Sequence, residues 1–314
     1  MRTTVIIITY NQEKYILDSL LSIENQTILP DQLIVADDCS QDNTYEKIQG
    51  FVSKSKIKNI VAFSNETNLG IVKNFNEALK RIDGDIVLIQ AGDDFSEKMR
   101  IEQTLDIFQK CDATMIYTSY KIVNENGDFK KNIIREGVYK EFDFFIKKGA
   151  GIAPFGGAFN INKYNKKIQI PEILRNEDDY LTFLSIKEGG IRVIKNVLYN
   201  FRVNTGVSSW MYSKDVTKEA LVKNYKEDIL NRIENYKCWK SLLSNDDDIN
   251  MQLLKKRIEL TIFIQNLENS SYYNRLSTLV KCKSITTIRE KLVLLGGFGI
   301  LFYLAKIKRI LLGI

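Results

Sequence analysis

The 314-residue sequence contains no histidine. This absence excludes serine–histidine and cysteine–histidine nucleophilic sites, histidine general bases and histidine metal ligands. Cysteine is also scarce, and the four cysteines lie far apart and form no CxxC pair. A zinc site is therefore not expected, and reduced thiols in the cytosol are the better interpretation. Any catalysis or metal binding has to use carboxylates, other oxygen atoms or lysine.

Long apolar runs are missing as well. The N-terminal segment MRTTVIIITY is too short for a signal peptide and has no small-residue cleavage site, so it predicts a buried first strand. Near the C-terminus an apolar run extends over 14 residues from Leu292 to Ala305. This is short of the roughly 20 residues that a helix needs to span a bilayer.

The net charge of +6 is concentrated at the C-terminal end. From residue 281 onward there are seven basic residues and one acid, Glu290, so the rest of the chain is close to neutral. This distribution does not support a nucleic-acid-binding body. Because basic residues flank the apolar run, we expect a helix that lies on a membrane surface containing anionic lipids. The alternative is a core helix that packs on the rest of the protein.

The first half of the sequence alternates short apolar, β-branched runs with segments of helical periodicity. The predicted strands are residues 5–9, 33–36, 60–63 and 86–89, and the predicted helices are residues 13–26, 42–52 and 71–82. Further strands are predicted at residues 115–123 and 191–203, with a glycine-rich loop at 149–160. This order predicts an α/β fold with a mainly parallel sheet and helices on both faces. We expect one domain over residues 1–214 and a helical region over residues 215–314.

Polar clusters follow these strands, where open α/β sheets bind their ligands. Asp93 and Asp94 come after the fourth strand. Two adjacent carboxylates repel each other, so a cation is expected beside them. Hard oxygen ligands suit Mg²⁺ or Mn²⁺ bridging a diphosphate. The alternative is a turn that caps a helix starting near Ser96.

Two other acidic clusters are weaker signals. Asp37 and Asp38 follow the second strand, where a carboxylate can accept hydrogen bonds from a base or a ribose, or can simply order a turn. Glu177, Asp178 and Asp179 precede a helical pattern. They are either ordinary acids of a helix N-terminus or they include a general base that takes the proton of an attacking hydroxyl.

The sequence contains four blocks in a specific order and spacing: VIIITYNQEKYILDSLLSIENQT, LIVADDCSQDNT, NLGIVKNFNEAL and GDIVLIQAGDD. Together they resemble the inverting family-2 glycosyltransferases of Rossmann-like GT-A fold. Two later blocks, NEDDYLTFLSIKEGG and VLYNFRVNTGVSS, are similar to that family's acid motif and to its arginine-containing strand. The resemblance covers about residues 3–210 and implies a nucleotide-sugar donor, a glycan or lipid-linked acceptor, and a role in bacterial surface-polysaccharide synthesis.

The resemblance also implies a set of site residues. Donor contacts fall on Thr9, Tyr10, Asn11, Asp37, Asp38, Asn68, Gly70, Lys73, Asn74 and Asp93. Asp94 and Asp93 would hold Mn²⁺ or Mg²⁺, with Asp93 also near the ribose. Asp178 would be the catalytic base, and Glu177 would position the acceptor or the loop. Gly156 and Gly157 are expected on the acceptor side, and residues 205–214 with Trp210 are expected to close over the site.

The implied reaction is one in-line displacement that inverts the configuration at the anomeric carbon.

This chain departs from the family pattern at two places. Many relatives carry a longer acidic run before the metal aspartate, where this chain has Gln90-Ala91-Gly92. Many also carry a histidine shortly after the arginine of the late strand, where this chain has Asn204.

Three other functions compete with this hypothesis. A sugar nucleotidyltransferase would need a GxGxRxxP-like start after the first strand, and a dinucleotide oxidoreductase would need GxGxxG there, but ITYNQEKYI has neither. A non-catalytic sugar-nucleotide or glycan-binding protein of the same fold is the third, against which Asp94 and Asp178 argue. By family habit we expect a UDP-sugar donor and a cytoplasmic enzyme, peripheral on the inner face of the cell membrane.

Overall fold

The computed structural model describes residues 1–148, 156–164, 167–205, 217–243, 247–282 and 288–296. The chain divides into two compact units. The first comprises residues 1–140 and 153–206, and the second comprises residues 141–152 and 207–314. This division differs from the predicted boundary at residue 214, because the segment 141–152 groups with the C-terminal helices.

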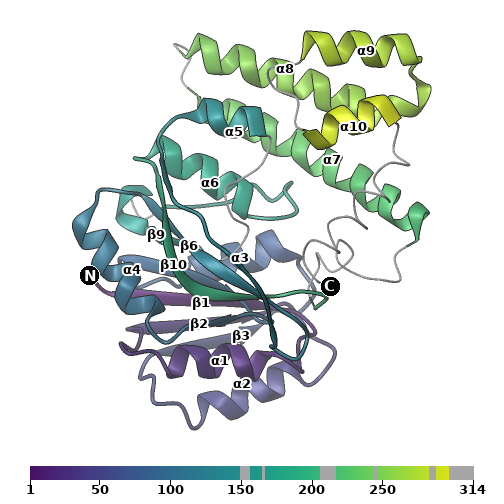
Figure 1. Cartoon of the computed structure of the whole chain (residues 1–314). Coiled ribbons are helices and arrows are strands. Elements are labelled where there is room, and N and C mark those ends of the chain that lie inside the picture. Colours follow the sequence, from purple (N-terminus) through teal and green to yellow (C-terminus); the bar gives the residue numbers. More distant parts are fainter. Residues whose placement is uncertain (149–155, 165–166, 206–216, 244–246, 283–287, 297–314) are drawn as a thin grey trace. The chain divides into compact units, whose positions relative to one another are not determined.

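Four parallel strands form the first half of the sheet in the first unit (Figure 1). They are β1 (Thr3–Thr9), β2 (Gln32–Asp37), β3 (Ile60–Ser64) and β4 (Ile86–Ala91), in the spatial order β3-β2-β1-β4. β1, β2 and β4 are mostly buried and apolar, as expected for strands that are covered on both faces. Thr9 pairs with Asp37, and Ile8 pairs with Ala91. The carboxyl ends of three strands therefore meet at one edge.

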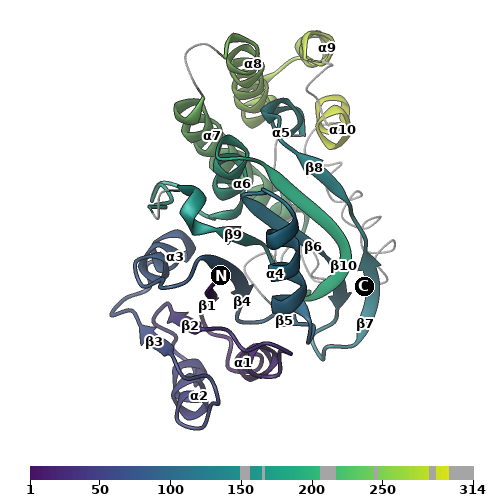
Figure 2. The same cartoon turned by 90° about the vertical axis from the view of Figure 1, so that its left-hand side faces the viewer.

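Helices cover these strands on both faces. α1 (Ile16–Glu24) and α2 (Thr44–Val52) lie on one side and α3 (Ile71–Leu79) lies on the other (Figure 2). The apolar residues of α1 and α2 share a core with β1, β2, β4 and α4 (Arg100–Lys110). Their helical spacing determines which face is buried. α3 begins after Gly70, whose φ of 83° lies in the left-handed region that glycine adopts without strain.

The second half of the sheet mixes parallel and antiparallel strands. β9 (Ala158–Asn160) lies antiparallel between β4 and β6 (Met115–Val123), and β6 runs parallel to β10 (Ile191–Arg202). The short strands β5 (Phe95–Ser96), β7 (Phe129–Ile133) and β8 (Gly137–Tyr139) add to β10, β6 and β10 respectively. α6 (Asp178–Lys187) precedes β10. The predicted α/β class with a mainly parallel sheet is confirmed, whereas β9 lies in a segment that was predicted as a loop.

The second unit is helical. It contains α5 (Phe142–Lys148), α7 (Lys218–Leu242), α8 (Asp248–Gln265), α9 (Tyr272–Lys281) and α10 (Ile288–Gly296). The Thr217 hydroxyl accepts the Ala220 N–H at 3.1 Å and so caps α7. Apolar side chains of α7, α8 and α10 form the core of this unit. Within the unit, both guanidinium nitrogens Nη1 and Nη2 of Arg257 donate to the Glu290 carboxylate, at 2.9 and 2.7 Å.

The apolar run near the C-terminus is described only in part. α10 includes its first residues, and residues 297–305 lie outside the described residues. A helix on the membrane surface therefore stays a prediction. In the described part of the chain, no helix combines the length and the apolar character that crossing a bilayer requires.

Candidate active site

The loops that follow β1 and β2 are locked together by hydrogen bonds. The Asn11 N–H donates to Ser40 Oγ at 2.8 Å, and Asn11 Oδ1 accepts the Gln41 N–H at 2.7 Å. Asn11 has a φ of 52°, a conformation that asparagine tolerates better than most residues. Thr9 is buried, whereas Tyr10 beside it keeps 42% of its surface exposed. Of the three predicted contacts on this loop, Tyr10 and Asn11 are exposed, and Tyr10 is the large aromatic side chain accessible to a ligand.

The two aspartates after β2 have different environments. Asp37 is fully buried, and its carboxylate accepts hydrogen bonds from the Ser40 N–H and from the hydroxyls of Ser40 and Ser64. Asp38 accepts the N–H groups of Leu69 and Gly70, both at 2.8 Å. Asp37 thus orders its own turn, and Asp38 holds the start of α3 against the end of β2.

The Asp38 carboxylate also accepts the Asn65 side-chain amide at 2.9 Å. A carboxylate offers about four acceptor sites, so Asp38 keeps roughly one for a ligand.

The residues predicted around the start of α3 divide into internal and exposed ones. Asn74 is 2% exposed, donates to the Ala36 carbonyl at 3.0 Å, and so ties α3 to β2. Asn68 and Lys73 are exposed. The Lys73 ammonium lies 3.6 Å from the Glu172 carboxylate in a solvent-exposed ion pair, which contributes little to stability. Lys73 is therefore available for another anion.

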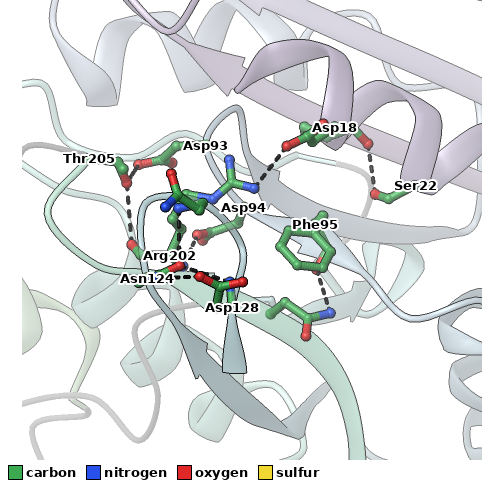
Figure 3. A network of polar contacts seen from close by, with 12 residues as sticks. Asp18, Ser22, Asp93, Asp94, Phe95, Asn124, Asp128, Arg202 and Thr205 are labelled. Atoms are coloured by element: carbon green, nitrogen blue, oxygen red, sulfur yellow. Dashed lines mark hydrogen bonds and ion pairs between the residues drawn. The ribbon is translucent and has the colours of Figure 1, made fainter. Parts of the chain in front are cut away.

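Asp93 and Asp94 are buried carboxylates at the end of β4, with exposed fractions of 6% and 1%. Asp94 is held by β10: Oδ1 accepts the Arg202 N–H at 2.7 Å, and Oδ2 accepts the Tyr199 hydroxyl at 2.9 Å. Asp93 Oδ2 accepts the Thr205 hydroxyl at 2.8 Å. Figure 3 shows the two carboxylates between the Arg202 side chain and Thr205.

Burial raises the pKa of the Asp93 carboxyl above its usual value. For Asp94, burial and the neighbouring Asp93 charge together raise the pKa still further. A divalent cation would offset both effects, and the donor set consists of the hard oxygens that Mg²⁺ and Mn²⁺ prefer. The described residues contain no group of three or more acidic or cysteine side chains that could hold a metal by themselves. The pair by itself offers carboxylate oxygens of the kind that Mg²⁺ and Mn²⁺ bind.

Arg202 supplies a cation that we did not include among the predicted site residues. Its side chain is 2% exposed, and its Nη2 donates to the Asp18 carboxylate at 2.9 Å (Figure 3). The guanidinium lies over the rings of Tyr15 and Phe95, at 4.7 and 5.3 Å from their centroids. Its Nε and Nη1 have no hydrogen-bond partner in the described part of the chain. In the sequence, Arg202 could have been recognised as a candidate site residue because it is the arginine in the block VLYNFRVNTGVSS.

Asn204, which stands where many relatives have histidine, lies on the same segment. Its φ is 68°, and its side-chain Oδ1 is buried without a hydrogen-bond partner among the described residues. Gln90, which stands in place of an acid of the family's longer acidic run, is fully buried and bonds internally to Ser19, Ser96 and Arg100. Of the two departures from the family pattern, Gln90 therefore lies inside the protein, whereas Asn204 is partly buried.

Asp178 is the first residue of α6, and Glu177 immediately precedes the helix. The Asp178 carboxylate accepts hydrogen bonds from the Asn176 side chain and, at 2.9 Å, from the Asp179 N–H. Desolvation raises the pKa of Asp178 well above its usual value, and the charges of Asp179 and Glu177 add to the effect. A carboxyl with a raised pKa is suited to proton transfer near neutral pH.

Gly156 and Gly157 are buried, and both pack against aromatic rings. A Cβ atom on Gly156 would come within 2.7 Å of the Tyr199 ring, and one on Gly157 within 2.8 Å of the Tyr117 ring. Packing alone therefore requires glycine at both positions. Burial raises the pKa of Tyr117 well above its usual value, and the charge of Asp178 adds to this effect. Of the predicted closing loop, residues 206–214 with Trp210 lie outside the described residues.

Comparison with known proteins identifies the family. Residues 4–169 match the model of "Glycosyl transferase family 2", which is more than half of the chain. The chain is 26% identical over 219 residues to the putative teichuronic acid biosynthesis glycosyltransferase TuaG of Bacillus subtilis, covering 67% of this chain and 84% of that protein. It is 32% identical over 192 residues to the Escherichia coli β-1,3-glucosyltransferase WfgD, covering 61% of this chain and 72% of that protein.

Solved structures show the same fold. The Staphylococcus aureus TarS fragment 1–349 in complex with UDP-GlcNAc has a TM-score of 0.59 at 18% identity, covering 95% of this chain and 91% of that one. The Pyrobaculum calidifontis mannosyltransferase PcManGT, in complex with GDP-Man and Mn²⁺, has a TM-score of 0.53 at 14% identity, covering 98% of this chain and 87% of that one. The sheet, the acid pair at its edge and the family match agree, and the chain belongs to glycosyl transferase family 2 and is a glycosyltransferase of GT-A fold.

Proposed function

We propose that this enzyme moves a sugar from a UDP-sugar to a hydroxyl of a growing, lipid-linked glycan in bacterial surface-polysaccharide synthesis, with inversion at the anomeric carbon. The observation that carries the proposal is the buried Asp93–Asp94 pair beside the Arg202 guanidinium, at the carboxyl edge of the sheet. Two carboxylates and a buried cation at strand ends suit a diphosphate bound together with a divalent ion.

We propose that the nucleoside of the donor binds at the ends of β1 and β2. The exposed Tyr10 ring offers a face on which a base can stack. Asp38 retains acceptor capacity for the N–H of a uracil ring beside its three protein donors. TarS structures that contain UDP and UDP-GlcNAc, and the UDP-Glc in the name of WfgD, support a uridine donor, whereas PcManGT was solved with GDP-Man.

We propose that the diphosphate of the donor binds between the acid pair and the start of α3. Asp94 and Asp93 would hold Mn²⁺ or Mg²⁺, which when bound offsets the charge of the leaving diphosphate. The mannosyltransferase structure with GDP-Man and Mn²⁺ supports a divalent ion. Lys73 would exchange its exposed contact with Glu172 for a phosphate oxygen, and Asn68 and Gly70 would line the same loop.

The chemistry is a single displacement. The acceptor oxygen forms a bond to the anomeric carbon while the bond from that carbon to the diphosphate oxygen breaks. Asp178 takes the hydroxyl proton on its carboxylate, and Glu177 orients the acceptor or the surrounding loop. Gly156 and Gly157 would lie on the acceptor side. Attack from the face opposite the diphosphate inverts the configuration.

The acceptor and the location follow from the relatives and from the charge of the chain. The names of TuaG and WfgD refer to teichuronic acid synthesis and to a diphosphoundecaprenol-linked sugar. The C-terminal region carries seven basic residues against one acid from residue 281 onward. We therefore place the enzyme in the cytoplasm, peripheral on the inner face of the membrane, with residues 1–214 as the catalytic domain and 215–314 as a helical region for attachment.

The test is a panel of UDP-, GDP- and dTDP-sugars, each with Mn²⁺, Mg²⁺ or a chelator. Thermal unfolding would report binding, and slow release of free sugar would report the chemistry. We expect stabilisation by a UDP-sugar only when a metal is present, together with slow hydrolysis of one donor. Equal stabilisation in the chelator would refute the metal role. Binding with no turnover, even with a lipid-linked acceptor, would instead indicate a non-catalytic binding protein.

A further inference from the structure

The hydroxyl of Tyr199 bridges both ends of the turn that carries the acid pair. It donates to Asp94 Oδ2 at 2.9 Å and accepts the Ala91 N–H at 3.2 Å. The turn is also closed by its own backbone, because the Asp94 N–H donates to the Ala91 carbonyl at 3.2 Å. The Tyr199 hydroxyl thus helps to fix both the position of the turn, through Ala91, and the orientation of the Asp94 carboxylate.

The ring of Tyr199 is held in place by two further residues. The guanidinium carbon of Arg100 lies 4.9 Å from the ring centroid, and the Gly156 backbone approaches so closely that a Cβ atom there would lie 2.7 Å from the ring. Tyr199 and Arg100 are each 1% exposed. The ring therefore has little freedom to change its position.

Arg100 has no carboxylate partner within ion-pair distance in the described part of the chain. Its Nη2 donates to the Ile89 carbonyl at 2.7 Å, its Nη1 donates to Ser96 Oγ at 3.0 Å, and its Nε is unpaired. Burying a guanidinium in this way is costly unless nearby groups compensate for it. The electron-rich face of the Tyr199 ring provides one such group. Arg100 therefore holds the end of β4 through the Ile89 carbonyl, and it also holds the Tyr199 ring, whose hydroxyl bonds to Asp94.

We propose that Tyr199 is a positioning residue: its hydroxyl, fixed by Arg100 and Gly156, holds the Asp94 carboxylate in the orientation that binds the divalent cation. This inference rests on the proposed metal role of Asp94. Partners that orient a metal-ligating group contribute to metal affinity without touching the metal, and losing one typically lowers the affinity about 10- to 100-fold. The backbone N–H of Arg202 would still hold the other oxygen, Oδ1.

The experiment measures Mn²⁺ affinity directly, in the presence of saturating UDP, by the paramagnetic resonance signal of free Mn²⁺. Tyr199→Phe keeps the ring and its packing but removes the hydroxyl. We expect its Mn²⁺ affinity to fall about 10- to 100-fold, while its affinity for UDP in the chelator and its unfolding temperature change little. Arg100→Lys, which keeps the charge but cannot lie flat on the ring, should lower the Mn²⁺ affinity by a smaller factor.

The matched control is Tyr164→Phe. Tyr164 is also buried, and its hydroxyl also makes a side-chain hydrogen bond, to Ser185 Oγ at 2.5 Å. This variant should bind Mn²⁺ as the wild type does. Asp94→Asn tests the metal site independently of Tyr199. If this variant keeps the wild-type Mn²⁺ affinity, the proposed metal site is wrong. If Asp94→Asn weakens binding while the Tyr199 and Arg100 variants bind like the wild type, the inference about Tyr199 is wrong.

Discussion

At the scale of single residues, the absence of histidine means that acid–base catalysis must use carboxyl groups, other oxygen atoms or lysine. The structure contains carboxyls with raised pKa values at two places, the end of β4 and the start of α6. Their physical causes are alike, because desolvation is the first cause for each and a neighbouring acid adds to it at Asp94, Glu177 and Asp178. Their proposed roles differ, since a cation would stabilise the charged form of Asp93 and Asp94, whereas an acceptor hydroxyl would lie beside Asp178.

Asp178→Asn tests the base. Asparagine keeps the size of the side chain but cannot take a proton, so we expect transfer to fall at least about 100-fold while the donor affinity stays within about twofold. Steady-state transfer and calorimetric donor binding measure the two quantities. The control is Asp112→Asn, an exposed acid that lies outside the proposed site and should leave both unchanged. Transfer at the wild-type rate by Asp178→Asn would exclude this residue as the base.

The pH profile tests the cause of the raised Asp178 pKa. The base acts only when it is ionised, so a raised pKa moves the acid limb of kcat/KM to higher pH than an ordinary aspartate would give. Asp179→Asn removes one of the charges that raise this pKa. We therefore expect the limb to move to lower pH in the variant, so that activity persists in more acidic buffer. An acid limb that stays in place would mean that Asp178 does not control it.

The sequence indicated the positions of some site residues but not the contacts that other residues make inside the protein. The acids at the strand ends were found from the sequence because carboxylates after apolar strands are visible there. The internal roles of Asp37 and Asn74 were not, since both bond to groups that come close only in the folded chain, such as Ser64 and the Ala36 carbonyl. The roles of Tyr199 and Arg100 were missed for the same reason.

At the scale of elements, α3 joins the end of β2 to the segment that leads to Asp178. Asn76 on α3 donates to the Ile170 carbonyl at 2.8 Å and accepts the Ile170 N–H at 2.9 Å. Both residues are buried, so one side chain satisfies both backbone groups of Ile170. Asn74, two positions earlier on the helix, bonds to β2 instead. The helix thereby fastens an irregular segment that would otherwise leave buried polar groups without partners.

Asn76→Ala tests this connection. The change leaves the N–H and C=O of Ile170 buried without partners, which we expect to lower the free energy of unfolding by about 2–3 kcal/mol. Urea unfolding measures the difference. Asn196→Ala is the matched control, because Asn196 is exposed and makes one surface hydrogen bond to Gln103, and it should cost less than about 0.5 kcal/mol. Equal stabilities of the two variants would show that the Ile170 contact is unimportant.

The elements themselves were predicted well where periodicity was strong. The strand predicted at residues 115–123 is β6 with the same ends, and the strand predicted at 191–203 is β10 less one residue. β9 was missed because it has three residues and follows two glycines, which favour a loop locally. Its strand conformation depends on pairing with β4 and β6, which are distant in the sequence.

At the scale of the whole molecule, the helical unit has its own buried charge pair. Arg257 lies in α8, and Glu290, 33 residues later, lies in α10. The side chains are 0% and 8% exposed, so the pair is shielded from water and salt. Because both nitrogens of the guanidinium fork are used, the pair fixes how α10 packs within its unit.

Glu290→Gln tests whether this pair stabilises the helical unit. Removing one partner leaves a buried guanidinium without its counter-charge, so we expect the unit to lose roughly 3–5 kcal/mol of stability. Hydrogen exchange of the α7, α8 and α10 amides measures the loss within this unit. Glu268→Gln breaks the exposed pair with Lys226 and should cost less than about 1 kcal/mol. Protection that is unchanged in Glu290→Gln would contradict the assigned role.

The sequence alone determined the fold class and the family, because apolar strand segments, helical periodicity and short motifs depend only on residues that are close together along the chain. It also determined that the chemistry must use carboxylates, other oxygen atoms or lysine, since the chain has no histidine. Only the tertiary structure decided which acids face inward and which residues hold them. Tyr199 and Arg202 lie 105 and 108 positions after Asp94, and β10 brings them to it by pairing antiparallel with β5, directly beside the acid pair. Hydrogen bonds and burial between such distant residues depend on the packed sheet, and no local pattern records them.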